Sequence, residues 1–379
     1  MIRVNEPLLG REEGRKVASC LKTNWISSQG KYLKIFEEQF ARYCGVRYGI
    51  GTTSGTTALH LALAAAGVGP GDEVLLPTFT MAATAFAVCY CGAGPVFIDS
   101  EPETFNIDPD RAAAYLRRQE KRGTLKVKAI IPVHIYGHPV DMDPLLDLAK
   151  KYNLLLIEDA AEAHGAEYKG KKCGSLGHLG CFSFYANKII TTGEGGMVVT
   201  DDPALAERAR SLKDLSHIPG RRFLHSELGF NYRLTNLQAA IGVAQLKKIT
   251  SHIRKKRRMA GHYRSGLKGI PGLTLPIEKP WAKNVYWMYG ILIDPAFGLS
   301  RDQLMVRLLE KGIETRSFFI PMHRQPLFQG GALKARSFGP FPVADRLADQ
   351  GLYLPSGLTL SRDQIETVCG RVRRLSLGH

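Results

Sequence analysis

Short apolar runs alternate with helix-like segments from about residue 48 to 215, and this alternation constrains the fold more than any other feature. The apolar runs have the length of buried strands, and apolar residues recur at helical spacing between them. This pattern is typical of a layered α/β domain with a mostly parallel sheet between helices. The predicted strands are YGIGT, EVLLP, PVFID, AIIPVH, LLLIED, FSFY and MVVT, and the predicted helices are TTALHLALAAAG, MAATAFAVCYCG, DMDPLLDLAKKY and PALAERARSLK.

The character of the sequence changes after about residue 250. Helix-like segments at 251–268 and 300–311 flank strand-like segments at 286–293 and 313–319, which predicts a smaller α+β domain. A chain of 379 residues fits a large and a small domain better than one core. The expected parts are an N-terminal segment at the domain interface (1–20), a large α/β domain (21–249) and a small C-terminal α+β domain (250–379).

The composition is that of an ordinary soluble globular protein, with 44% hydrophobic and 23% charged residues. The N-terminus lacks the basic-then-apolar pattern of a signal peptide. The longest uncharged run, 81–98, contains two glycines and a proline, so it predicts a buried helix and a strand rather than a membrane span. The seven cysteines form no CxxC pair, which indicates core thiols in a reducing, cytoplasmic compartment and no zinc or other metal site.

The net charge of +16 is compatible with nucleic acid, an anionic membrane or an anionic small substrate. The densest basic run is 254–258, within HIRKKRRMAGHYRSGL. The helical spacing of its apolar neighbours leaves the basic residues largely on solvent-facing sides, so we interpret it as a solvated helix face. Zinc-finger spacing, an RNP-type aromatic pattern and an obvious helix-turn-helix are all missing from the sequence, which disfavours a nucleic-acid partner.

A candidate anion site begins at Ser54-Gly55-Thr56, which follows strand YGIGT and starts an Ala/Leu-rich helix. A helix N-terminus offers free backbone N–H groups and a positive dipole end, and a glycine lets an anion approach the backbone. The segment matches neither GxGxxG nor GxxxxGK[ST], which disfavours dinucleotide and P-loop sites. Taken alone, such a Ser-Gly-Thr is more often a simple helix cap.

Two acids, Glu158 and Asp159, end the apolar strand LLLIED. Ligands of open α/β sheets bind at the carboxyl ends of strands, so an acid here either faces a ligand or caps a helix. The sequence alone leaves these two alternatives open. His164 lies a few residues later, and we interpret it as a histidine satisfied by local hydrogen bonds rather than as a metal ligand.

Lys188 stands in the uncharged stretch FSFYANKII, just before a glycine-rich tight turn at 193–196. A lysine among apolar neighbours either lets its head reach solvent or is held for chemistry. An anion cradle, a carboxylate at a strand end and a semi-buried lysine are together the parts of a pyridoxal 5′-phosphate (PLP) site. In such a site the lysine amine forms a Schiff base with the cofactor aldehyde, and the carboxylate keeps the pyridinium nitrogen protonated.

The ordered set of motifs resembles the sugar aminotransferases of the DegT/DnrJ/EryC1/StrS family, within fold-type I PLP enzymes. The resemblance covers nearly the whole chain. It is carried by TNWISSQGKYLKIFEEQFA, TSGTTALHLAL, VLLPTFTMAATAFAV, PVHIYGHPVDMDP, IEDAAEAHGAEYKGKKCGSLG, FSFYANKIITTGEGGMVV, GFNYRLTNLQAAIGVAQL and IETRSFFIPMHRQP. It implies a seven-stranded, mostly parallel sheet in the large domain.

The resemblance also implies roles for individual residues. Lys188 would be the Schiff-base lysine and the proton shuttle, and Asp159 would pair with the pyridinium nitrogen. The N-terminal end of the helix that begins at residue 55 would bind the phosphate, together with the hydroxyl of Ser183. Asn231, in GFNYRLTN, would reach the phosphate from the neighbouring subunit, which implies a homodimer with shared active sites. The helix-end residues are Ser54, Gly55 and Thr56.

Other matching positions are assigned more loosely by the resemblance. Met81 stands where an aromatic residue often stacks on the cofactor ring, and Glu162 stands near the ring. Four residues match segments that line the sugar-nucleotide pocket, although ordinary packing or surface pairing would also explain them. These four are Trp25, Ser28, Arg316 and His323.

TNWISSQG, PVHIYGHPVDMDP and ETRSFFIPMHRQP look most like family members that move an amino group from L-glutamate to C4 of GDP-4-keto-6-deoxy-D-mannose. One alternative is amination of a dTDP- or UDP-linked 4-keto or 3-keto sugar. Another is a non-catalytic regulatory or binding protein with the same fold. A third, PLP-dependent 3-dehydration, belongs to relatives with histidine at the lysine position, so Lys188 argues against it. Binding of nucleic acid through residues 254–258 is the last.

Overall fold

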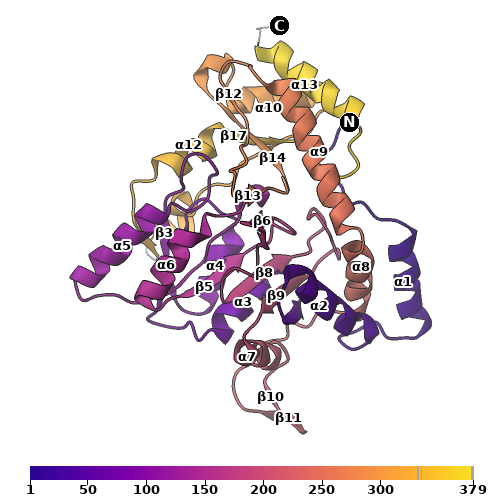
Figure 1. The fold of residues 1–379 in the computed structure, drawn as a ribbon, viewed down its shortest axis with the longest axis vertical. Coiled ribbons are helices and arrows are strands. Elements are labelled where there is room, and N and C mark those ends of the chain that lie inside the picture. The colour runs from indigo at the N-terminus through magenta and orange to yellow at the C-terminus, as the bar shows by residue number, and fades with distance from the viewer. Residues whose placement is uncertain (331–332, 334, 377–379) are drawn as a thin grey trace.

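A mixed eight-stranded sheet forms the centre of the larger lobe in this computed structural model, which describes residues 1–330, 333 and 335–376 (Figure 1). The strand order is β1-β9-β8-β5-β4-β2-β3-β16. All neighbours pair in parallel except β9, which is antiparallel to β1 and β8. The strands are β1 (Tyr48–Thr52), β2 (Glu73–Pro77), β3 (Gly94–Ile98), β4 (Val127–Ile130), β5 (Leu155–Asp159), β8 (Leu179–Ser183), β9 (Gly196–Thr200) and β16 (Arg336–Ser337).

The predicted α/β class is confirmed, and each of the seven predicted strands overlaps a strand of this sheet, although FSFY and AIIPVH extend past the ends of β8 and β4. The eighth strand, β16, comes from the C-terminal part of the chain and pairs with β3 at the sheet edge. This strand is only two residues long, which is too short to show the apolar pattern of a strand in the sequence. Its position therefore depends on tertiary contacts that the sequence pattern does not reveal.

Side chains of the sheet alternate between two buried cores, which explains why its strands are apolar throughout. In β2, Leu76 packs into a core on one face of the sheet, and Leu75 packs into a separate core on the other face. Strands covered on both faces need apolar residues at every position rather than at every second one. The same alternation in β5 puts Ile157 on the face of Leu76, and it sets the directions of the two acids that follow.

Helices cover both faces of this sheet, as expected for alternating strands and helices. The α3 helix packs on β8 and β9, whereas α6 packs on β4 and β5. Ser54 caps α3 because its hydroxyl accepts a hydrogen bond from the Thr57 N–H (3.2 Å). The helices of the large lobe are α1 (Arg11–Lys22), α2 (Lys31–Cys44), α3 (Gly55–Ala65), α4 (Ala82–Tyr90), α5 (Pro109–Lys121), α6 (Met142–Tyr152), α7 (Pro203–Lys213) and α8 (Asn236–Leu246).

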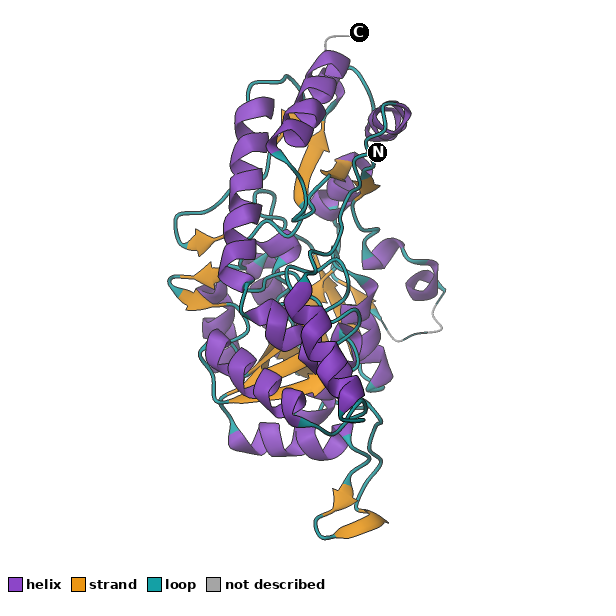
Figure 2. Cartoon of the chain, turned by 90° about the vertical axis from the view of Figure 1, so that its right-hand side faces the viewer, coloured by secondary structure: helices purple, strands orange, loops and turns teal. Residues whose placement is uncertain are grey.

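A four-stranded antiparallel sheet with its own apolar core forms the smaller lobe, at the top of Figure 1. Its strand order is β12-β14-β17-β15, and helix α9 leads into it from the large lobe (Figure 2). The elements are α9 (Ile249–Leu267), β12 (Leu273–Thr274), β14 (Tyr289–Ile293), α10 (Arg301–Glu310), β15 (Arg316–Ser317), α11 (Pro326–Gln329), α12 (Pro342–Gln350), β17 (Gly351–Leu354) and α13 (Arg362–Ser376).

The N-terminal segment contacts both lobes. Ile2 forms a bridge with Ile313 of the smaller lobe, and the carbonyl of Val4 accepts from the Ser356 N–H (2.7 Å). The α1 helix that follows packs on α8 of the large lobe. The first residues therefore tie the two lobes together.

A β-hairpin of β10 (His217–Ile218) and β11 (Arg221–His225) projects from the lower end of the molecule in Figures 1 and 2. A separate small sheet of β6 (Glu167–Tyr168), β7 (Lys171–Lys172) and β13 (Ala282–Lys283) connects segments of the two predicted domains. Among the described residues, no helix is long and apolar enough to cross a membrane. All seven cysteines are free thiols, and five are buried, as predicted for core residues.

The basic run 254–258 on α9 is only partly solvent-facing. Arg254, Lys255 and Arg258 are exposed, as predicted. Arg257 is instead paired with Glu278, and Lys256 is 1% exposed. The prediction of a solvated face is thus wrong for Lys256, because small-lobe segments cover that side of the helix.

Candidate active site

A cavity of about 370 Å³ opens at the carboxyl ends of β5 and β8. It is lined by residues of the large lobe and also by four from the smaller lobe or its connections: Trp287, Arg316, Phe319 and Tyr353. Nine of the predicted site residues come together here. They are Ser54, Gly55, Thr56, Met81, Asp159, Glu162, Ser183, Lys188 and Arg316.

The Lys188 side chain is only 11% exposed, and its amine points into the cavity wall formed by an acid and an indole. Its Nζ lies 4.0 Å from Glu162 Oε1 and 3.9 Å from the centre of the Trp287 ring. Burial lowers the pKa of Lys188, and the charges of Glu162 and Asp159 oppose that shift. A lysine amine in such surroundings is available in its neutral, nucleophilic form more readily than one in water.

Asp159 faces the cavity, and its neighbour Glu158 does not. Thr84 Oγ1 donates a hydrogen bond to Asp159 Oδ2 (2.7 Å), and the Ala161 N–H donates to Oδ1 (3.2 Å). Burial raises the pKa of Asp159, against the effects of the Thr84 hydrogen bond and the Lys188 charge. The carboxylate is therefore fixed in direction and ready to pair with a cationic group in the cavity.

Glu158 points to the opposite face of the sheet because successive strand residues alternate. There its carboxylate accepts hydrogen bonds from the backbone N–H groups of Gly174, Leu176 and Gly177 (2.6–2.7 Å) and hydrogen-bonds the ring of His134 (2.9 Å). Cys173 Sγ lies close to both side chains. These hydrogen bonds order the loop after β7, so Glu158 has a structural role and Asp159 is the acid at the candidate site.

Glu162 is the second acid of the cavity. The Tyr136 N–H donates to its Oε2 (2.7 Å), and its Oε1 faces Lys188. Burial raises the pKa of Glu162 to about 7, although the Lys188 charge favours the carboxylate. Glu162 and Lys188 therefore form a pair that can share a proton near neutral pH.

The N-terminus of α3 and the end of β8 meet in a tight cradle at one side of the cavity. A Cβ atom at Gly55 would lie 2.7 Å from Ser183 Cβ, so only glycine fits this position without displacement. Gly55 and Thr56 are the first residues of α3, whose leading N–H groups have no partner within the helix. Backbone donors, a hydroxyl and a helix dipole together suit a phosphate.

Three predicted site residues lie outside the cavity of their own chain: Asn231, Trp25 and Ser28. Asn231 is exposed and forms a bridge with Asp214. Ser28 lines a different cleft, together with Asp214 and residues of the β10–β11 hairpin. Trp25 is 54% exposed, and its carbonyl accepts from Asn236 Nδ2 (2.7 Å). Ser28 and Asn231 are thus linked through Asp214, outside the cavity of their own chain.

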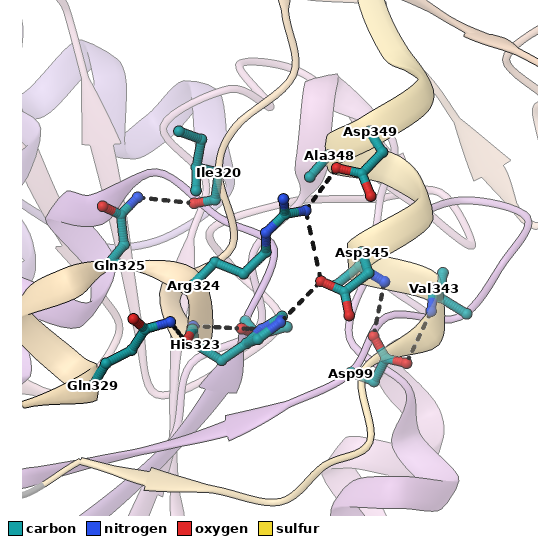
Figure 3. A network of polar contacts seen from close by, with 12 residues as sticks. Asp99, Ile320, His323, Arg324, Gln325, Gln329, Val343, Asp345, Ala348 and Asp349 are labelled. Atoms are coloured by element: carbon teal, nitrogen blue, oxygen red, sulfur yellow. Dashed lines mark hydrogen bonds and ion pairs between the residues drawn. The ribbon is translucent and has the colours of Figure 1, made fainter.

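His323 is also absent from the cavity lining, and Figure 3 shows why its ring has another role. Its Nδ1 hydrogen-bonds Thr78 Oγ1 (2.8 Å). Its Nε2 hydrogen-bonds Asp345 Oδ1 (3.1 Å), as Figure 3 shows. The ring also stacks on Phe341. Both ring nitrogens are engaged, so His323 joins the end of β2 to helix α12 and has no free nitrogen for a substrate.

The prediction that His164 is satisfied by local hydrogen bonds is wrong. Its ring is buried among Phe40, Phe182 and Phe184. Neither nitrogen forms a hydrogen bond of normal geometry in the described part of the chain, and only a weak contact with the Ser183 backbone favours the charged ring. Burial lowers the pKa of His164 to about 3, so the ring is neutral. It packs as an aromatic residue behind the candidate site.

The sequence analysis missed two residues that shape the site. Trp287 covers the Lys188 amine, and its Nε1 donates to the Asn187 carbonyl (2.8 Å). Thr84 orients Asp159 from helix α4. Thr84 lies three positions after Met81 in a helical segment, a spacing that places both near one end of the helix. The surrounding sequence NVYWMYG gives no sign that Trp287 lines a site, because a tryptophan in such an apolar segment is equally typical of a protein core.

Comparison with known proteins identifies the family. The model of the DegT/DnrJ/EryC1/StrS aminotransferase family matches residues 7–373. The chain belongs to this family. The chain is 44% identical to the GDP-perosamine synthase of Caulobacter vibrioides over 97% of this chain and 96% of that one, and 41% identical to the enzyme of that name from Escherichia coli O157:H7 over the same shares. It superposes on S. venezuelae DesV, solved with a ketimine intermediate, with a TM-score of 0.87 and 37% identity over 96% of this chain and 94% of that one.

This DegT-family chain is a PLP-dependent sugar aminotransferase, and its cavity fits the cofactor. The glycine-lined cradle suits the phosphate, Asp159 lies at the buried end, and Lys188 offers the amine. Bound PLP supplies an aldehyde that can bond an amine and a ring that can accept electrons. The cofactor prediction is confirmed by the family.

Proposed function

We propose that this enzyme transfers an amino group from L-glutamate to C4 of GDP-4-keto-6-deoxy-D-mannose, forming GDP-perosamine. The observation that carries the proposal is the buried amine of Lys188, held 4.0 Å from Glu162 in the cavity that also contains Asp159. The choice of sugar is supported by the two relatives named GDP-perosamine synthase. The segments TNWISSQG and ETRSFFIPMHRQP favour the same substrate.

We assign the main chemical role to Lys188. Its amine would be the group that holds the cofactor through its aldehyde, and the same amine would serve as the base that moves a proton at the reacting carbon. Glu162 accepts or returns a proton at the Lys188 amine, because the two groups face one another and the pKa of Glu162 is raised to about 7. Asp159, held by Thr84, keeps the ring nitrogen of the cofactor protonated.

The remaining cavity residues bind and position. Gly55, Thr56 and Ser54 present the start of α3 to the cofactor phosphate, and Ser183 adds its hydroxyl. Met81, 54% exposed on the cavity wall, covers the cofactor ring with its thioether. Arg316, whose only ion-pair partner in the described residues is Glu314 at 3.7 Å, presents a largely exposed positive charge to an anionic substrate.

We also propose that two copies of the chain share their active sites in the cytoplasm. Ser28 lines a cleft together with Asp214, which forms a bridge with Asn231, and Trp25 lies three positions before Ser28. All three residues lie outside the cavity of their own chain, and in a dimer they would contact the cavity of the partner subunit. The same segments carry exposed apolar side chains, including Ile26 and Leu228. A face of this kind on a soluble enzyme suits a subunit interface.

The test is a product assay by mass spectrometry. Purified protein with PLP and glutamate is offered GDP-4-keto-6-deoxymannose, alongside dTDP- and UDP-4-keto-6-deoxyglucose. We expect amination of the GDP sugar alone. Amination of another sugar instead would overturn the substrate but keep the chemistry. If no sugar is aminated and no PLP is bound, a non-catalytic binding protein becomes the better interpretation.

A further inference from the structure

Lys256 is a buried lysine that the proposed chemistry does not use. It lies on helix α9 and is 1% exposed, and no acidic side chain in the described ranges forms an ion pair with it. Its Nζ donates instead to two backbone carbonyls, those of Trp287 (2.9 Å) and Ser356. Burying an amine costs free energy, and two neutral acceptors recover only part of that cost. A hydrophobic residue would fill the same space at a lower cost in free energy. The presence of a lysine therefore indicates that its two hydrogen bonds have a function.

The Trp287 carbonyl connects Lys256 to the candidate active site. The same residue presents its indole to the Lys188 amine at 3.9 Å and donates from Nε1 to the carbonyl of Asn187, the residue before Lys188. Trp287 is thus fixed at both ends, by Lys256 at its backbone and by Asn187 at its ring. A shift of its backbone would move the indole away from the Lys188 amine.

The Ser356 carbonyl connects Lys256 to the smaller lobe. Ser356 accepts from the Tyr289 N–H at its hydroxyl (2.9 Å) and donates from its N–H to Val4 (2.7 Å). The Lys256 amine therefore joins three chain segments: α9, the residues just before β14, and the loop after β17. Burial lowers the pKa of Lys256 to about 7, and even the neutral amine has two N–H groups for two carbonyls.

We propose that Lys256 is a positioning residue for the active site, which acts by holding the Trp287 backbone so that the indole stays against the Lys188 amine. The inference rests on the proposed role of Lys188. It does not depend on which sugar is aminated, because the Lys188 environment also serves the half-reaction with glutamate.

The test uses Lys256→Met, which keeps most of the side-chain length and removes every N–H donor. Selective labelling with ¹⁵N-tryptophan gives signals for only three indoles, and Trp287→Phe assigns that of Trp287. In the cofactor-free protein, we expect the Trp287 indole N–H to exchange with solvent at least about tenfold faster in Lys256→Met than in the wild type. Lys255→Met, on the exposed side of the same helix, is the matched control and should leave that rate unchanged.

The kinetic readout is the half-reaction with glutamate in the PLP-loaded enzyme. Its rate constant should fall about tenfold in Lys256→Met, with little change in the glutamate concentration at half-maximal rate. An unchanged indole exchange rate would overturn the proposal. Equal acceleration of backbone amide exchange throughout the smaller lobe would also overturn it, because that result assigns Lys256 to general packing.

Lys256→Gln keeps two N–H donors on a shorter side chain and carries the test if the methionine variant does not fold. Its indole exchange should then lie above the wild-type rate, since the amide does not reach both carbonyls. A wild-type rate in a folded Lys256→Gln protein would overturn the proposal. If no sugar is aminated but the half-reaction with glutamate is normal, the proposed sugar substrate is wrong and the proposed role of Lys256 is unaffected.

Discussion

The Lys188 amine has three different kinds of neighbour: an acid, an indole face and the wall of a cavity. Burial favours the neutral amine, whereas Glu162 and the Trp287 ring favour the ammonium. The net effect is a lowered pKa of the Lys188 amine, so it loses its proton more readily than a lysine in water. That balance, more than the presence of a lysine, makes the site suitable for bonding an aldehyde and moving protons.

Replacement of Lys188 by alanine should therefore abolish turnover. We expect a loss of at least about a hundredfold, the scale expected when an acid–base group is removed. Lys188→Arg keeps the charge but lacks a primary amine, so it should fail equally. Reduction of the PLP-loaded wild type with borohydride should label the peptide that contains Lys188, and mass spectrometry should find no label in either variant. Turnover near the wild-type rate in Lys188→Ala would rule out this role.

Glu162 should make the stability of the cofactor-free enzyme depend on pH. Its pKa in the folded state is raised to about 7 from the usual 4.5. The folded protein thus holds a proton that the unfolded chain releases, so this contribution to stability is present at low pH and is lost as the pH rises through about 7.

The measurement is the free energy of unfolding by urea at about pH 5 and about pH 8 for the wild type and Glu162→Gln. The glutamine cannot titrate, so the wild type should lose more stability than Glu162→Gln between these two pH values. Equal losses in the two proteins would show that Glu162 is ionised throughout this range.

At the scale of elements, the cradle depends on a close approach between α3 and β8. A Cβ at position 55 would press on Ser183, so Gly55→Ala should separate the helix end from the strand end. We expect PLP to bind about tenfold more weakly, a change of about 1.4 kcal/mol. Fluorescence titration of the apoenzyme with PLP measures this. Gly14→Ala, at a glycine with open space around its Cβ position, is the control and should leave PLP affinity unchanged.

The elements of the large sheet could be predicted because each strand is apolar on both faces. The same pattern placed the acids Glu158 and Asp159 at a strand end, but it could not tell Asp159 from Glu158. Because side chains alternate along β5, only one of these two acids can face the cavity. Which one does so depends on the side of the sheet on which α3 and α4 pack, and the strand pattern does not reveal that side. Lys256 was placed in solvent because a helical pattern does not reveal what packs on the helix from residues 287 and 356. The hydrogen bond between His323 and Asp345 could not be predicted for the same reason, since the two residues are 22 positions apart.

At the scale of the whole molecule, the proposed shared sites can be tested by mixing inactive variants. Lys188→Ala damages a site through its own chain, and Asn231→Ala should damage the site of the partner. In a mixed dimer, one site would carry both lesions and the other would carry neither. Equal mixtures that exchange subunits freely should therefore recover about a quarter of wild-type activity. No recovery, despite mixed dimers detected by native mass spectrometry, would place both residues in one subunit's site.

The path of the chain between the lobes has a consequence for how the protein can be divided. Residues 2–4 pair with the smaller lobe, α9 runs from one lobe into the other, and β16 returns to the edge of the large sheet. A fragment cut at the predicted boundary near residue 250 would lose an edge strand on one side and the N-terminal pairing on the other. The two lobes are thus better regarded as one cooperative folding unit, in which neither half is expected to survive as an independent gene product.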